Sequence, residues 1–152
     1  MKLSRIISCL ALVFLFLETS GQVILNGDFE DHNFSSCRYN LDNDQYTNSM
    51  NHLWGLGSGN ELDVQNSACG YAEAPSNDWF VSLAKGFSGQ YDELSLKMSE
   101  PVVEGKVYEL TYFELAADTF ENNLIPPEIG LSADSLSFGT VIHTSTLTDF
   151  DV

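Results

Sequence analysis

The chain has few positive charges. Only 6 of its 152 residues are Lys or Arg, against 22 Asp and Glu, and the formal net charge is −16. A surface this acidic repels phosphate backbones and anionic headgroups, so we exclude nucleic acid and membrane surfaces as partners. The same charge suits calcium, a hard cation that prefers carboxylate and carbonyl oxygens. The simpler alternative is that the charge only keeps an exported protein soluble.

Motifs for common catalytic chemistry are also missing. His32, His52 and His143 are far apart and form no His-x-x-x-His pair, and there is no Gly-x-Ser-x-Gly elbow. Asp and Glu are so abundant that no particular pair stands out as the two carboxylates of a glycoside hydrolase. We therefore expect no enzymatic activity within this chain.

The main hydrophobic run is short and lies at the N-terminus. Two basic residues precede an apolar run from Ile6 to Leu17, and small residues follow up to Gly21. The run is shorter than the roughly 20 residues that span a bilayer. It has the charged start, apolar centre and small-residue end of a secretory signal peptide. We predict that residues 1–21 are removed and that residues 22–152 are secreted or displayed at the cell surface, without membrane insertion.

Export determines the expected state of the cysteines. Cys9 lies in the leader, so Cys37 and Cys69 remain in the mature chain. In an oxidising compartment two cysteines favour one disulfide, and without a histidine at ligand spacing they make a poor zinc site. A Cys37–Cys69 bond would close a long loop and stabilise the fold by about 3 kcal/mol.

Period-two alternation replaces helical periodicity. We find no sustained apolar stripe at 3.6-residue spacing, whereas short alternating or apolar segments recur between Gly and Pro turn signals. They are Trp79–Leu83, Leu94–Met98, Val107–Leu115, Ile129–Leu131 and Phe138–Ile142. Short strands between turns predict an all-β sandwich or barrel. Trp79 shares its face with Val81 and Leu83, so we assign it to the core.

The stretch from Asp31 to Asp78 is rich in Asn, Asp, Ser and Gly. A structureless loop of this length is unusual inside a compact domain. We therefore expect two short strands here, around Cys37–Leu41 and His52–Leu56, tied by long loops and the disulfide. Asp42-Asn43-Asp44 lacks the later Gly and Glu of an EF-hand loop, and we interpret it as a polar turn.

Several motifs, taken in order, resemble one family of β domains. Asn26-Gly27-Asp28-Phe29-Glu30 resembles the N-G-x-F-E start of galactose-binding-like jelly-roll domains, and Leu94–Leu110 resembles their L-x-x-P-V-x-x-G-x-x-Y-x-L hairpin. Trp79–Leu83 and Ile129–Gly139 resemble further strands. The family includes carbohydrate-binding modules and domains of secreted and surface proteins of Bacteroidetes-type bacteria. The resemblance implies a jelly-roll β-sandwich over residues 22–152.

The resemblance also implies a structural calcium ion. In the family, the glutamate of the opening motif commonly binds calcium together with an acidic residue near the end of the domain. Glu30 matches the glutamate and Asp28 lies beside it, but the closing ligand has no match; the alternative is that both are solvated. Leu147–Val152 begins another alternating pattern and stops. We therefore expect the chain to be truncated, lacking its last strand or strands.

Sugar-binding modules of this architecture stack aromatic rings on pyranose faces. Trp54, beside two glycines, is the first candidate for such contact, and Tyr46 and Tyr71 follow; for Trp54 the alternative is packing beneath the long loop. We interpret the chain as a non-catalytic binding module for a glycan or cell-surface polymer. A structural or adhesive module of a larger surface protein and the N-terminal part of a secreted glycoside hydrolase remain alternatives. The oligomeric state is left open.

Overall fold

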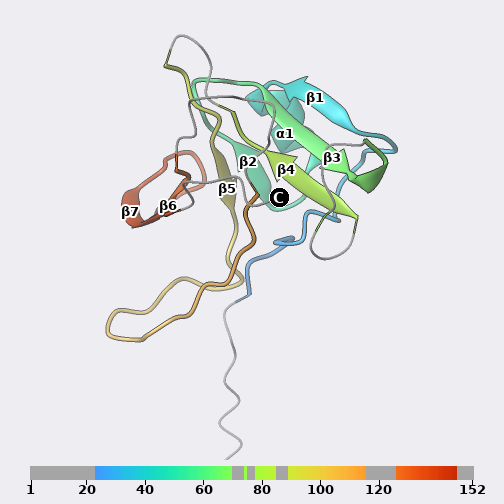
Figure 1. The fold of residues 1–152 in the computed structure, drawn as a ribbon. Helices are drawn as coiled ribbons and strands as arrows, with labels where there is room; N and C mark the ends of the chain where they lie inside the picture. The colour runs from blue at the N-terminus through green and yellow to red at the C-terminus, as the bar shows by residue number, and fades with distance from the viewer. Residues whose placement is uncertain (1–22, 70–73, 75–77, 85–88, 116–125, 147–152) are drawn as a thin grey trace, which may run out of the picture.

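The computed structural model describes residues 23–69, 74, 78–84, 89–115 and 126–146 (Figure 1). The predicted leader, Tyr71 and Leu147–Val152 lie outside these residues. No helix in the described ranges is long and apolar enough to cross a membrane. The described elements, in chain order, are β1 (Arg38–Leu41), α1 (Asn43–Ser49), β2 (Leu53–Gly55), β3 (Leu62–Asn66), η1 (Ser67–Cys69), β4 (Trp79–Ser82), β5 (Leu94–Leu96), β6 (Glu128–Leu131) and β7 (Thr140–Thr144).

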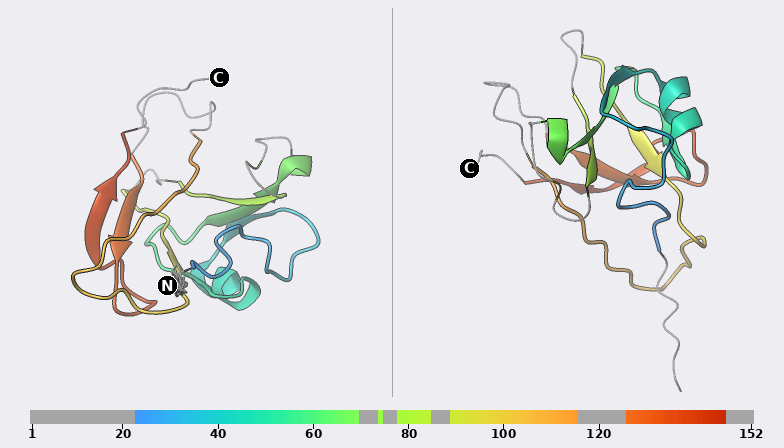
Figure 2. Two further views of the ribbon diagram at one scale, coloured as in Figure 1. Left: turned by 90° about the horizontal axis from the view of Figure 1, so that it is seen from below. Right: turned by 90° about the vertical axis from the view of Figure 1, so that its right-hand side faces the viewer.

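The largest sheet is antiparallel, with strand order β1-β3-β4 (Figure 2). On one side of β3, Asp63 pairs with Ser82 and Asn66 pairs with Trp79. On the other side, β1 pairs with an irregular register and contains Asn40 at φ 53°. The Asn40 amide donates to Asp63 Oδ1 at 2.7 Å. A side-chain hydrogen bond therefore ties β1 to β3 where the register is irregular.

α1 begins with a capping box. The Gln45 amide donates to Asp42 Oδ1 at 2.7 Å, and the Asp42 amide donates to Gln45 Oε1 at 3.1 Å. These two bonds satisfy backbone donors at the first turn of the helix that would otherwise have no partner. The polar turn predicted at Asp42–Asp44 is therefore wrong, because these residues cap and start a helix.

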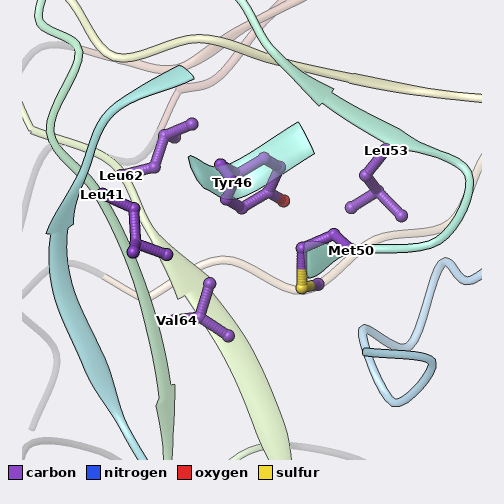
Figure 3. Close-up of a cluster of buried hydrophobic side chains, with 6 residues drawn as sticks. All are labelled: Leu41, Tyr46, Met50, Leu53, Leu62 and Val64. Carbon is purple, nitrogen blue, oxygen red and sulfur yellow. The ribbon is translucent and has the colours of Figure 1, made fainter. Parts of the chain in front are cut away.

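The core lies between α1, β2 and the inner faces of β3 and β4 (Figure 3). It consists of Leu41, Tyr46, Met50, Leu53, Leu62 and Val64. Tyr46 and Met50 are four residues apart and share one helix face, while Leu62 and Val64 alternate onto one face of β3. Around this cluster pack the partly buried Phe29, Phe34, Trp79, Val81, Leu94 and Leu96. The core assignment of Trp79 is confirmed, whereas Leu83 is exposed.

A buried carboxylate joins two loops beside this core. Asp92 Oδ1 accepts from the Glu61 amide at 3.2 Å, and Oδ2 accepts from the Ala84 amide at 2.9 Å. A Cβ at Gly57 or Gly59 would run into the backbone around Asp92. Glycine at these two positions therefore permits the close approach that Asp92 needs.

The opening segment forms a turn. Ile24 makes an isolated bridge with Met98, and Asn26 then adopts φ 53° while its carbonyl accepts from the Phe29 amide at 3.1 Å. The reversal directs Phe29 against the core. The fold is thus built from small antiparallel sheets and one short helix. The described residues do not close into a sandwich, so the jelly roll stays a prediction.

In residues 101–146 the observed strands differ from those predicted. β6 and β7 pair with each other, but all of β7 is exposed. Residues 101–115 contain no strand and are exposed throughout. The strand predicted at Val107–Leu115 is therefore absent as a hydrogen-bonded element, because no described strand lies alongside it to complete the ladder.

Candidate functional site

A pocket of about 370 Å³ opens beside the disulfide. Its lining residues come from the segment that enters β1, from β1 itself, from the last residue of β3 and from η1. They are Ser35, Ser36, Cys37, Tyr39, Asn66, Ala68 and Cys69. The volume lies in the range of small-molecule sites, towards its lower end.

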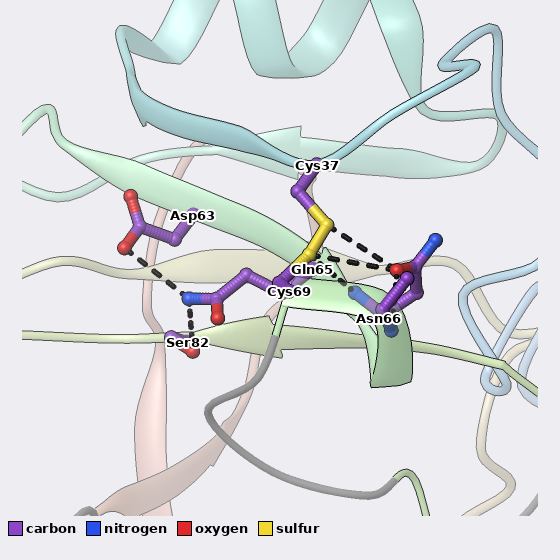
Figure 4. The surroundings of a disulfide bond; sticks show 7 residues. Cys37, Asp63, Gln65, Asn66, Cys69 and Ser82 are labelled. Carbon is purple, nitrogen blue, oxygen red and sulfur yellow. Dashed lines mark hydrogen bonds between the residues drawn. A yellow bond between two sulfur atoms is a disulfide. The ribbon is translucent and has the colours of Figure 1, made fainter.

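The Cys37–Cys69 disulfide joins the two walls of this pocket (Figure 4). Cys37 immediately precedes β1, and Cys69 ends η1, 32 residues later. Their Cα atoms are 6.5 Å apart, within the usual span of a disulfide. The bond predicted from the sequence is confirmed. It adds a covalent link between two segments that are also joined by the pairing of β1 with β3.

Asn66 supports the pocket and contributes a polar group to it. Its Oδ1 accepts from the Ala68 amide at 3.0 Å and lies 3.3 Å from the sulfur of Cys37. These contacts orient the amide, and no described residue accepts a hydrogen bond from its Nδ2. Tyr39 lies on β1 with 46% of its surface exposed. The pocket therefore combines an accessible aromatic ring with an oriented amide.

A row of polar side chains crosses the neighbouring strands (Figure 4). Gln65 Nε2 donates to Ser82 Oγ at 3.0 Å and to Asp63 Oδ2 at 3.4 Å. Burial raises the pKa of the Asp63 carboxyl, and the negative charges of Asp92 and Glu61 add to this effect, while the Asn40 amide opposes it. The row links β3 to β4, and none of its members lines the pocket.

The aromatic residues singled out from the sequence lie elsewhere. Trp54 is half-buried on β2, opposite Ser95 on β5, and does not line the pocket. Tyr46 is completely buried in the core, so its ring has no face available to a ligand. Tyr71 lies outside the described residues. The structure does not bring these three residues together into one site.

Glu30 and Asp28 were predicted to bind calcium. Glu30 Oε1 accepts from the amides of Asp78 and Trp79 at 2.8 and 2.9 Å, so this oxygen secures the start of β4. Asp28 is exposed. Among the described residues, no group of three His, Cys, Asp or Glu side chains could hold a metal ion. The calcium site at Glu30 and Asp28 therefore stays a prediction.

Sequence reasoning missed Tyr39 and Asn66. The available signal was proximity to the predicted disulfide: Ser35-Ser36-Cys37-Arg38-Tyr39 places two hydroxyls and a ring beside one cysteine, and Asn66 lies three residues before the other. Comparison of the chain with protein-family models, curated proteins and solved structures found no significant match. The function is therefore argued from the pocket itself.

Proposed function

We propose that this protein is a secreted or cell-surface, non-catalytic carbohydrate-binding module whose binding site is the pocket beside Cys37–Cys69. The observation that carries the proposal is the presence of Tyr39 and Asn66 in one pocket braced by a disulfide. A sugar presents apolar C–H faces and a rim of hydroxyls. An exposed tyrosine offers a ring for the faces and a hydroxyl at its edge. Asn66 and the serine hydroxyls offer donors and acceptors for the rim.

Rigidity of the site supports this function. Binding loses affinity when loops or side chains must be ordered in the complex. Here the disulfide fixes the two walls, and the Ala68 amide fixes the Asn66 side chain. The pocket is thereby organised before any ligand arrives.

The charge of the protein narrows the ligand class. The net charge of −16 repels sulfated or uronic-acid polymers. The residues that line the pocket include no carboxylate, imidazole or basic group. A neutral glycan therefore fits best, and the lining offers no acid–base pair to cleave it. The predicted signal peptide and the disulfide agree with action outside the cytoplasm, where disulfides persist.

A structural or adhesive module is the second candidate. The observation in its favour is the exposed apolar character of residues 101–115, which a purely sugar-binding role does not use. The two functions use different surfaces and can be tested separately.

The proposal is tested by titrating the mature chain with a panel of neutral oligosaccharides in a calorimeter, with calcium and with EDTA. For a glycan that binds, Tyr39→Ala is expected to weaken the affinity at least tenfold, equivalent to about 1.4 kcal/mol, because the stacking surface is lost. Tyr91→Ala is the matched control. Tyr91 is exposed to a similar extent, 42%, but does not line the pocket.

Two results would contradict the proposal. One is the absence of binding to every neutral glycan, both with calcium and with EDTA. The other is an equal loss of affinity in Tyr39→Ala and Tyr91→Ala, which would show that the pocket is not where the glycan binds. An affinity that disappears only with EDTA would support calcium as a cofactor of the glycan site.

A further inference from the structure

The Cys37–Cys69 disulfide forms part of the pocket wall and can be reached from the pocket. Both cysteines are lining residues, and neither is fully buried. A disulfide that is sealed in a core is shielded from solutes, whereas an exposed one is open to attack by thiols. The pocket therefore leads a small molecule to a bond that a thiol can break.

The two sulfur atoms have different surroundings (Figure 4). The backbone amide of Asn66 donates to the sulfur of Cys69, with nitrogen and sulfur 3.4 Å apart. The side-chain oxygen of Asn66, held by the Ala68 amide, lies 3.3 Å from the sulfur of Cys37 and 3.5 Å from that of Cys69. The oxygen is thus close to both sulfurs, but within the described residues only the sulfur of Cys69 accepts from an N–H group.

This asymmetry determines which sulfur leaves when a thiol attacks. In thiol–disulfide exchange, an incoming thiolate bonds to one sulfur, the S–S bond breaks, and the other sulfur takes the electron pair as a thiolate. An N–H donor stabilises the negative charge that grows on the departing sulfur. Cys69 is therefore the better leaving group, and the sulfur of Cys37 is the one that forms the new bond.

We propose that Cys37 is a modification site, at which a small neutral or cationic thiol forms a mixed disulfide and releases Cys69 as a thiolate. The incoming sulfur bonds to the Cys37 sulfur, and the electron pair of the broken S–S bond passes to the Cys69 sulfur. The Asn66 amide stabilises this thiolate until solvent protonates it, or until it attacks the mixed disulfide and restores the original bond. The exchange needs no reagent besides the thiol, and it does not depend on glycan binding.

The charge of the protein selects among thiols. The residues that line the pocket include no carboxylate or basic group, so the local charge is small. The whole chain, however, has a net charge of −16, and its field repels anionic solutes and attracts cationic ones. A cationic thiol should therefore react faster than an anionic one. Salt screens the field and should narrow the difference.

The first test locates the adduct on the folded, disulfide-bonded mature chain without any substitution. The protein is treated with a limited amount of cysteamine at pH 7, quenched in acid to stop exchange, digested with pepsin and mapped by mass spectrometry without reduction. Cysteamine is expected on Cys37 about ten times as often as on Cys69. In guanidinium chloride the Asn66 amide no longer faces Cys69, so the two cysteines should then carry similar amounts of adduct.

A second test changes the charge beside the bond. Asn66→Asp keeps an oxygen for the Ala68 amide but places a negative charge beside both sulfurs, and it is expected to slow exchange with cysteamine about tenfold. Asn48→Asp adds the same charge at an exposed amide on α1, outside the pocket, and should leave the rate nearly unchanged. With the unsubstituted protein, anionic 3-mercaptopropionate should react more slowly per thiolate than cysteamine, and less so at high salt.

Several results would overturn the proposal. They are equal adduct on the two cysteines of the folded protein, adduct mainly on Cys69, exchange that begins only when denaturant unfolds the chain, and equal slowing by Asn66→Asp and Asn48→Asp. Far-UV circular dichroism checks that both variants remain folded, and the mapping of the unsubstituted protein does not depend on them. None of these measurements contains a glycan, so their outcome is independent of the proposed glycan binding.

Discussion

Tyr46 carries a buried hydroxyl without a hydrogen-bond partner among the described residues (Figure 3). Its ring fills the centre of a small core, and its phenol is desolvated. Burial raises the pKa of Tyr46 well above its ordinary value of 10.0. The sequence identified Tyr46 as an accessible aromatic because its neighbours are polar, but helical geometry turns this one side chain inward.

The buried Tyr46 phenol makes the unfolding free energy of the protein fall as pH rises in the alkaline range. Because the folded-state pKa is raised, the contribution of neutral Tyr46 is fully present below the unfolded pKa of about 10, and it is lost as pH rises above that value. The loss amounts to about 1.4 kcal/mol per pH unit for this group. We predict that Tyr46→Phe raises the unfolding free energy by about 1 kcal/mol at pH 7, because an unsatisfied buried hydroxyl is removed. Urea unfolding of both proteins between pH 7 and pH 11 measures the effect.

The gap between the two proteins should widen above pH 10, since the other tyrosines are common to both. Parallel stability profiles up to pH 11 would mean that Tyr46 ionises normally in the folded state. Lower stability of Tyr46→Phe at pH 7 would mean that the hydroxyl has a hydrogen-bond partner.

Glu30 shows how far one residue can be predicted from sequence. The opening motif singled it out, and in the structure Asn26 forms a turn and Phe29 packs against the core. Its hydrogen bonds to the Asp78 and Trp79 amides join residues nearly 50 positions apart. No local pattern encodes such a partner, so the motif located the residue without revealing that it secures β4.

At the scale of elements, α1 was missed although its signals were present. Asp42 and Gln45 have the spacing of a capping box, and Tyr46, Met50 and Leu53 follow at helical and near-helical intervals. The helix has only 7 residues, so its apolar stripe is too short to be conspicuous. The neighbouring β1 and β2 were predicted to within about a residue of their observed ends.

The capping box gives a prediction for α1. A helix of this length is not stable on propensity alone, so its cap and its packing must hold it. We predict that Asp42→Ala lowers the unfolding free energy by about 1–2 kcal/mol, because the Gln45 amide loses its acceptor. Asp42→Asn, which retains a capping oxygen, should lose much less. Urea unfolding followed by circular dichroism compares the three proteins. If both variants lost the same unfolding free energy, the charge of Asp42 and not its capping oxygen would be stabilising α1.

For the whole molecule, composition and alternation predicted a mostly β protein, and the small antiparallel sheets confirm that much. They did not predict which strands pair. β2 pairs with β5 across some forty residues, and β3 pairs with β4 across the segment after the disulfide. The Val107–Leu115 alternation has no partner strand among the described residues. Alternation reports that a segment can form a strand, but only a neighbour makes it one.

The Cys37–Cys69 bond acts on the whole molecule because it fixes the sheet and the pocket together. We predict that the double variant Cys37→Ser with Cys69→Ser lowers the unfolding free energy by about 2–4 kcal/mol, since the unfolded chain regains the freedom of a long loop. Its glycan affinity should fall as well, because both pocket walls end on this bond.

Urea unfolding and calorimetry, each with and without a phosphine reductant, measure the two effects. Reductant should bring the unmodified protein to the level of the double variant and leave the double variant unchanged. If reduction lowered the unfolding free energy but left the glycan affinity unchanged, the pairing of β1 with β3 would be sufficient to maintain the pocket. The disulfide would then stabilise the fold without contributing to binding.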